Sequence, residues 1–142
     1  MGKARILCID DDRATVTIIS GVLTKEGYET FAAYDGHDGV NKAIELRPDL
    51  IILDIMMPDI DGFEVCKQLK HHPATNNIAV LMLTAKGDVD ENVHDSWRFA
   101  NKVVDCNKGY DAGAIEFLTK PVKAKDLVQR VKAILWASGL PV

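Results

Sequence analysis

Short, mostly apolar runs alternate with amphipathic stretches along this chain. Runs of strand length cover Arg5–Ile9, Leu50–Leu53 and Ile78–Leu83. A run that is apolar on both faces is typical of a strand in a parallel sheet that helices cover on each side. Two weaker candidates, Tyr28–Ala33 and Ala114–Leu118, raise the number of predicted strands to five.

Between these runs, apolar residues recur at helical spacing. The first stripe ends at Gly27, the second before Pro48 and the third at Pro73, and glycine and proline commonly end helices. Strand and helix thus alternate five times, which predicts a doubly wound α/β domain with helices on both faces of the sheet. We expect Trp136 to pack the last helix against that sheet. The four stripes are Val16, Ile19, Val22 and Leu23; Val40, Ala43, Ile44 and Leu46; Phe63, Cys66 and Leu69; and Leu127, Val131, Ile134 and Leu135.

Composition is that of an ordinary soluble domain. The 142 residues fit one domain, with 47% apolar and 27% charged residues. We find no signal peptide and no apolar run near the roughly 20 residues that span a bilayer. Cys8, Cys66 and Cys106 lack metal-ligand or redox spacing, so we expect reduced thiols in a cytoplasmic protein. The net charge of −4, without a basic stripe, argues against direct nucleic-acid binding.

Polar residues stand where the predicted strands end. Asp10 and Asp11 follow the first strand, while Asp54, Thr84 and Lys120 follow the third, fourth and fifth. In open sheets of this type the ligand site lies at the carboxyl ends of the strands, so these side chains should converge. Clustered carboxylates repel one another, and Mg²⁺, which prefers oxygen ligands, would offset that repulsion. A carboxylate, a cation, a lysine and a hydroxyl are what phosphoryl transfer requires. Asp54 stands alone and is the better nucleophile, whereas the aspartate pair is the better metal cradle.

Four segments carry a family resemblance: ILCIDDD at 6–12, LIILDIMMPDIDGFEV at 50–65, LMLTA at 81–85 and FLTKP at 117–121. They resemble segments of the response-regulator receiver domains of two-component signalling, in order and at fitting spacings. The resemblance implies a single receiver domain over residues 1–142. It also implies a flavodoxin-like fold, in which a five-stranded parallel sheet has the strand order 2-1-3-4-5.

The resemblance further implies roles for individual residues. Asp54 would be the phosphoacceptor, and Lys120 would bind the incoming phosphoryl oxygens. Asp11 and Asp54 would ligate Mg²⁺ directly, Asp10 would act largely through water, and the backbone carbonyl of Met56 would be a further ligand. The peptide bond that follows Lys120 would be cis.

The resemblance also implies a switch and its partners. A histidine kinase or a histidine phosphotransfer protein would donate the phosphoryl group, and hydrolysis would reset the protein, which is not a conventional enzyme. Thr84 would move toward the new phosphoryl group and Phe117 would change rotamer. The face made by the fourth helix, fifth strand and fifth helix would then signal to a downstream protein or to a second copy of the chain.

One interval departs from the family pattern. The stretch between Thr84 and Lys120 is longer than usual, with the extra residues within about 93–110. Its helical spacing favours an elongated fourth helix, interrupted near Asn107–Gly109. The wide apolar band of this stretch fits a partner-binding surface and fits equally a cover for the domain's own core.

Two other functions were weighed. A haloacid-dehalogenase-type hydrolase requires an Asp-x-Asp-x-Thr motif, but Ala14 occupies the threonine position, and we set this aside. A receiver-like binding module with a constitutively set output surface stays open because of the insertion, although the acceptor, acid pair and lysine are all present. We expect Asp12 to cap the first helix and Met56 to be a packing residue, and the pattern offers His37 and His94 no partner.

Overall fold

The computed structural model describes residues 3–84 and 115–139. The predicted elongation of the fourth helix within 93–110 lies outside these residues. In the described portions, every helix is too short or too polar to cross a lipid bilayer. The strands are β1 (Arg5–Ile9), β2 (Glu29–Ala33), β3 (Leu50–Asp54), β4 (Ala79–Thr84) and β5 (Ile115–Thr119), and the helices are α1 (Arg13–Lys25), α2 (Gly36–Leu46), α3 (Gly62–His71) and α6 (Ala124–Ala137).

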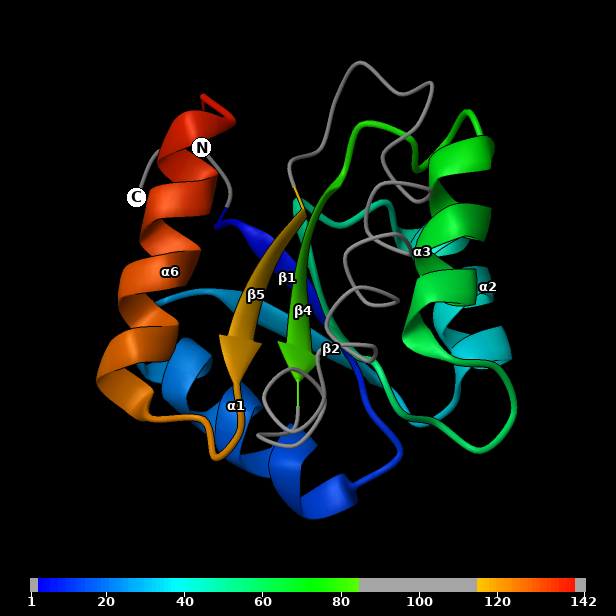
Figure 1. Cartoon of the computed structure of the whole chain (residues 1–142). Coiled ribbons are helices and arrows are strands. Elements are labelled where there is room, and N and C mark those ends of the chain that lie inside the picture. The colour runs from blue at the N-terminus through cyan, green and yellow to red at the C-terminus, as the bar shows by residue number, and fades with distance from the viewer. Residues whose placement is uncertain (1–2, 85–114, 140–142) are drawn as a thin grey trace, which may run out of the picture.

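The strands form one parallel sheet in the order β2-β1-β3-β4-β5, as predicted (Figure 1). The pairings Ile9↔Leu53, Asp54↔Leu83 and Thr84↔Thr119 bring the carboxyl ends of four strands to one edge. The strands at the centre, β1, β3 and β4, are almost entirely buried, which explains why their sequences are continuously apolar.

Helices cover both faces of the sheet. Side chains that alternate along the strands point to opposite faces: Ile6 and Cys8 join a core cluster with α1 and α6, and Leu7 and Ile9 join a second cluster with α2 and α3. Figure 1 shows these two pairs of helices on opposite sides of the strands. The doubly wound α/β architecture is therefore confirmed.

Trp136 does not pack against the sheet, and the sequence-based expectation was wrong. Its side chain is 73% exposed. The buried residues of α6 are Leu127, Val131, Ile134 and Leu135. At about 100° per residue, position 136 falls on the opposite side of the helix from the centre of that stripe.

Aspartates cap α1, α2 and α3, the helices that follow β1, β2 and β3. Asp12 accepts from the Ala14 N–H, Asp35 from the Asp38 N–H and Asp61 from the Glu64 N–H. Each cap satisfies a backbone donor that the first turn of the helix leaves free. The predicted capping role of Asp12 is confirmed.

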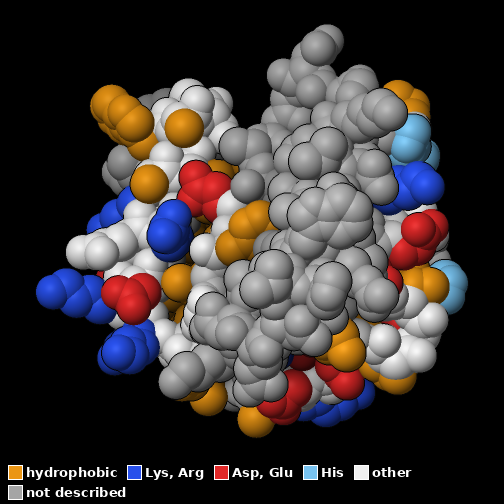
Figure 2. All heavy atoms as spheres, viewed as in Figure 1, with side chains coloured by type: hydrophobic (Ala, Val, Ile, Leu, Met, Phe, Trp, Pro, Cys, Tyr) orange, Lys and Arg blue, Asp and Glu red, His pale blue; other side chains and the backbone are white. Residues whose placement is uncertain are grey.

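The surface carries charges of both signs. On the face drawn in Figure 2, Lys and Arg side chains are interspersed with acidic and neutral ones. Acidic side chains are visible at the edge where the strand arrows of Figure 1 end. That edge holds the candidate site.

Candidate functional site at the carboxyl edge of the sheet

Backbone hydrogen bonds place the polar residues at the ends of the strands. The Asp10 N–H donates to the Ala33 carbonyl at 3.1 Å, which extends the β1–β2 pairing by one residue. The Lys120 N–H donates to the Thr84 carbonyl at 2.7 Å, which does the same for β4 and β5. Residues that are distant in the sequence therefore meet at one edge because the parallel ladder continues to it.

Lys120 bridges two buried carboxylates. Its Nζ atom lies 3.1 Å from Asp10 Oδ2 and 3.1 Å from Asp54 Oδ1. Both aspartates are buried at the ends of their strands. The structure thus brings together the predicted phosphoacceptor, one member of the acid pair and the predicted lysine.

The carboxylates also form a candidate cation site. Asp10, Asp11 and Asp54 each offer an oxygen, and these atoms lie within 4.8 Å of one another. Asp10 Oδ1 accepts from the Asp12 N–H at 3.0 Å, but among the described residues no donor reaches Asp10 Oδ2 in hydrogen-bond geometry, although Lys120 Nζ is at ion-pair distance. A buried anionic oxygen without a hydrogen bond is costly, and a hard divalent cation would satisfy it. The donor set therefore fits Mg²⁺.

Electrostatics agree with a surplus of negative charge. Burial and the neighbouring charge of Asp10 raise the pKa of Asp54 from 3.8 to about 6, although Lys120 opposes the shift. Burial lowers the pKa of Lys120, but its close contacts with the negatively charged Asp10 and Asp54 carboxylates outweigh burial, so the pKa is raised overall. One lysine does not balance the carboxylates, which leaves room for a further cation.

Thr84 and Phe117, the predicted switch residues, lie on the neighbouring strands β4 and β5. Thr84 is the last residue of β4 and is buried. Phe117 on β5 is half-buried, pairs with Met82 in the sheet and packs against the core cluster on the α2–α3 side. The Lys120–Pro121 peptide bond is cis, as the family resemblance implied.

The loop after Asp54 corrects one expectation. Met56 is not a packing residue, because its side chain is 64% exposed. Met57, the next residue, packs against the core instead. The pattern of apolar residues did not distinguish these neighbours because the loop has no regular periodicity.

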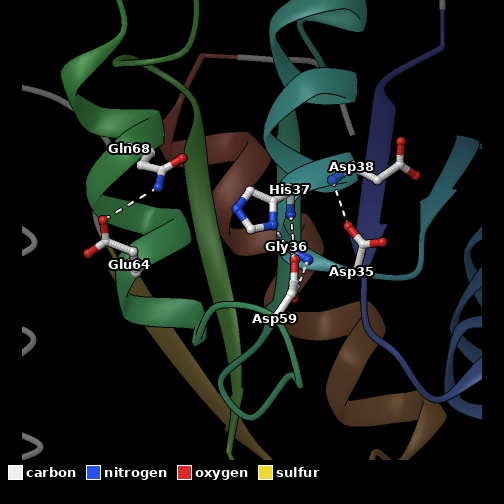
Figure 3. Close-up of polar contacts among 7 residues, drawn as sticks. All are labelled: Asp35, Gly36, His37, Asp38, Asp59, Glu64 and Gln68. Carbon is white, nitrogen blue, oxygen red and sulfur yellow. Dashed lines mark hydrogen bonds and ion pairs between the residues drawn. The ribbon is translucent and has the colours of Figure 1, made fainter.

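A second correction concerns His37. The sequence offered it no partner, but its Nδ1 atom lies 2.8 Å from Asp59 Oδ2 (Figure 3). Asp59 also accepts from the backbone N–H groups of Gly36 and His37. Asp59 is 22 positions from His37 and 23 positions from Gly36, and no local sequence motif indicates that they are in contact. His94 lies outside the described residues.

A doubly wound five-stranded sheet with clustered aspartates and a lysine at its carboxyl edge is suited to phosphoryl transfer. The family model for the response regulator receiver domain matches residues 6–97. The chain belongs to this family, which acts in two-component signalling and in which Mg²⁺-dependent phosphorylation is a general property.

Two relatives and one solved structure show the same family resemblance. Over 131 residues the chain is 40% identical to the DNA-binding dual master transcriptional regulator RpaA of Synechocystis. The aligned region covers 92% of this chain and 48% of RpaA. It is 37% identical to the alkaline phosphatase synthesis transcriptional regulatory protein PhoP of Bacillus subtilis, covering 96% of the chain and 50% of PhoP. The chain therefore spans about half the length of these relatives. The chemotaxis protein CheY4 of Vibrio cholerae is similar in structure, with a TM-score of 0.74, 27% identity, and coverage of 94% of this chain and 100% of CheY4.

Proposed function

We propose that Asp54 accepts a phosphoryl group from a phosphohistidine on a partner, a histidine kinase or a histidine phosphotransfer protein. The observation that carries this proposal is the position of Lys120 Nζ, 3.1 Å from both Asp10 Oδ2 and Asp54 Oδ1. An ammonium group beside a carboxylate at the open edge of the sheet is suited to neutralise an incoming phosphoryl group. Residues 1–142 would form a single receiver domain, and the transfer from the partner would take place in the cytoplasm.

Four residues would hold Mg²⁺. Asp11 and Asp54 would be direct ligands, Asp10 would act largely through water, and the Met56 carbonyl would be a further ligand. Bound there, Mg²⁺ supplies positive charge that offsets the carboxylates and the phosphoryl oxygens. Support comes from the buried Asp10 Oδ2 atom, which accepts no hydrogen bond from the described residues although it pairs with the Lys120 ammonium group.

The transfer breaks one bond and forms one. An oxygen of Asp54 attacks phosphorus while the N–P bond of the phosphohistidine breaks, and its electron pair stays on the imidazole nitrogen, which takes up a proton. The Lys120 ammonium group stabilises the charge on the transferring oxygens. In the reset step, water attacks the phosphorus of the acyl phosphate, which yields inorganic phosphate and restores the Asp54 carboxylate. The protein consumes its own phosphoryl group and so is not a conventional enzyme.

Phosphorylation then changes a distant surface. The Thr84 hydroxyl would move toward the bound phosphoryl group and donate a hydrogen bond to it. Phe117 would then change rotamer in the space that the movement of Thr84 opens. The output face would consist of β5, α6 and the fourth helix that the sequence predicts, and it would contact a downstream protein or a second copy of the chain. RpaA is named as DNA-binding and is about twice as long; for this chain, with a net charge of −4, we propose contacts with protein and not with nucleic acid.

The central claim is tested by incubation with acetyl phosphate and Mg²⁺, followed by intact-mass analysis. The wild type should gain the mass of one phosphoryl group and Asp54→Asn should gain none. Asp38→Asn is the matched control, since Asp38 is an exposed carboxylate on α2 that pairs with Lys42. The proposal would be refuted if the wild type gained no phosphoryl mass, or if Asp54→Asn were labelled to the same extent as the wild type.

The output is tested by sedimentation before and after saturation with a phosphoryl mimic and Mg²⁺. A change of mass indicates assembly of two copies. A constant mass, with altered hydrogen exchange in β5 and α6, indicates a downstream protein. A molecule whose mass and exchange both stay constant would favour the constitutively set binding module.

A further inference from the structure

The loop between Asp54 and α3 is bound to the start of α2 through one carboxylate. Asp59 accepts from the Gly36 N–H through Oδ1 at 3.0 Å and from the His37 N–H through Oδ2 at 2.9 Å. The His37 ring adds a contact of 2.8 Å from Nδ1 to the same Oδ2 atom. Figure 3 shows Asp59 between these groups. Free backbone N–H groups and the positive end of the helix dipole make the start of a helix a favourable place for an anion, and here the anion comes from the loop.

The capping of α2 is thereby shared between two aspartates. Asp35, on the helix's own side, accepts from the Asp38 N–H at 2.7 Å. Asp59 takes the N–H groups of Gly36 and His37, which Asp35 does not reach. The first three donors of α2 are therefore all satisfied, and two of them depend on the loop.

Close packing reinforces this attachment. A Cβ atom at Gly36 would collide with Cγ1 of Ile60, so the loop reaches the helix only because residue 36 has no side chain. At the other end of the loop, the Gly62 N–H donates to the Ile55 carbonyl at 2.7 Å, and the Ile55 N–H donates to the Leu83 carbonyl at 3.2 Å. The loop is thus held at Ile55 by the sheet and at Asp59 and Ile60 by α2.

Met56 lies between these two attachments. Only Met56, Met57 and Pro58 separate Ile55 from Asp59. The Met56 side chain is largely exposed, so its own packing does not hold the residue in place. The position of its backbone carbonyl is therefore set by its neighbours: Ile55 in the sheet, Met57, which packs against the core, and the attachment at Asp59.

We infer that Asp59 is a positioning residue of the cation site, which by binding the start of α2 holds the Met56 carbonyl where it completes the ligands offered by Asp10, Asp11 and Asp54. The inference rests on the proposed function, because it takes the Met56 carbonyl as a ligand. Asp59 is not one of the three clustered carboxylates, and it would act on the site only through the loop. Residues that orient metal ligands in this way commonly affect metal affinity by about 10–100-fold.

The charges around Asp59 support this assignment. Burial alone would raise the pKa of Asp59. Four hydrogen bonds outweigh burial and hold the pKa well below its usual range; they come from the backbone of Gly36, His37 and Ile60 and from the His37 ring. The carboxylate is therefore ionised, and charge-assisted hydrogen bonds are the stronger kind. Other charged groups nearby have other partners: Lys42 binds Asp38 at 3.2 Å, and Glu64 accepts from Gln68 at 3.4 Å (Figure 3).

The test measures Mg²⁺ binding to the unphosphorylated protein by calorimetry. Asp59→Ala should raise the Mg²⁺ dissociation constant about tenfold. Asp59→Asn, which keeps one acceptor oxygen, should raise it by a smaller factor, and His37→Ala should change it least because the two backbone bonds remain. Asp38→Asn, the matched control, removes a carboxylate from the same turn of α2 without touching the loop and should bind Mg²⁺ as the wild type does.

A merely structural role gives a different result. Hydrogen exchange at Gly36 and His37 should accelerate in Asp59→Ala whichever role holds, but only a positioning role weakens Mg²⁺ binding. Faster exchange with an unchanged dissociation constant would overturn the inference. If Asp59→Ala does not fold, Asp59→Asn decides in the same way.

The wild type separates this inference from the proposed function. If the wild type accepts a phosphoryl group at Asp54 but the Asp59 variants bind Mg²⁺ with unchanged affinity, only the positioning role is refuted. A wild type that acetyl phosphate does not label would remove the proposed function itself.

Discussion

Asp54 lies in a cluster whose charges do not balance. It shares Lys120 with Asp10, and both carboxylates are buried. The pKa of Asp54 is raised to about 6, which means that the folded protein binds a proton there more tightly than the unfolded chain does. Removal of that negative charge should therefore stabilise the fold when no divalent cation is present.

Asp54→Asn tests this at the residue scale. The group's folded pKa of about 6 exceeds its usual 3.8, so its contribution to stability falls as pH rises from about 4 to 6. In the presence of EDTA, the free energy of unfolding of the variant relative to the wild type should increase by about 2 kcal/mol between pH 4 and pH 7. Urea unfolding at both pH values measures it. If the difference in free energy of unfolding between the variant and the wild type does not change with pH, the raised pKa is contradicted. Added Mg²⁺ should make this difference smaller.

Lys120 carries a separate prediction. Lys120→Gln removes the ammonium group that lies 3.1 Å from Asp54 Oδ1. Loss of one preorganised charge that stabilises a transition state commonly costs about a hundredfold in rate. The initial rate of labelling by acetyl phosphate at saturating Mg²⁺ should fall by about that factor. Lys125→Gln, at an exposed position of α6, is the control, and equal rates in the two variants would exclude the proposed role.

At the scale of elements, α6 shows how apolar periodicity distributes residues between core and solvent. Leu135 is fully buried, while its neighbour Trp136 is 73% exposed. Leu135→Ala should lower the free energy of unfolding by about 2–5 kcal/mol, since it leaves a cavity. Trp136→Ala should change it by no more than about 0.5 kcal/mol, as is usual for an exposed site. Denaturant unfolding compares them, and a larger loss at Trp136 than at Leu135 would contradict the packing described.

The same contrast explains what the sequence could predict. Buried strands such as β3 are continuously apolar because both faces are covered, so strand positions, sheet order and the convergence of Asp10, Asp54 and Lys120 followed from pattern and resemblance. Trp136 lies outside the buried stripe of α6 because the phase of the helix, and not the size of the side chain, decides which residues face the sheet. The contact of His37 with Asp59 was missed because it depends on how a loop without periodicity meets a helix 22 positions away.

At the scale of the whole molecule, the site ties together parts of the chain that are distant in sequence. Asp10 and Asp11 follow β1, Asp54 ends β3, and Lys120 follows β5. A cation bound by the three aspartates would therefore connect β1 to β3 only in the folded state. Ligands that bind the folded state alone stabilise it in proportion to the logarithm of their concentration.

Mg²⁺ should accordingly raise the thermal stability of the entire domain. At a hundred times its dissociation constant, the gain is about 2.7 kcal/mol, which corresponds to a rise of about 5–10 °C in Tm for a domain of this size. Differential scanning calorimetry with Mg²⁺ and with EDTA measures the shift.

Two consecutive aspartates, Asp11 in the cluster and Asp12 outside it, separate this effect from general screening of charge. Asp11→Asn removes a proposed ligand and should abolish most of the Mg²⁺-dependent shift. Asp12→Asn removes an equal charge from the next residue, the cap of α1, where asparagine is also a good capping residue. This control should keep the full shift, since Asp12 is not among the three clustered carboxylates. Equal shifts in both variants would mean that Mg²⁺ acts on the overall negative charge and not at the cluster.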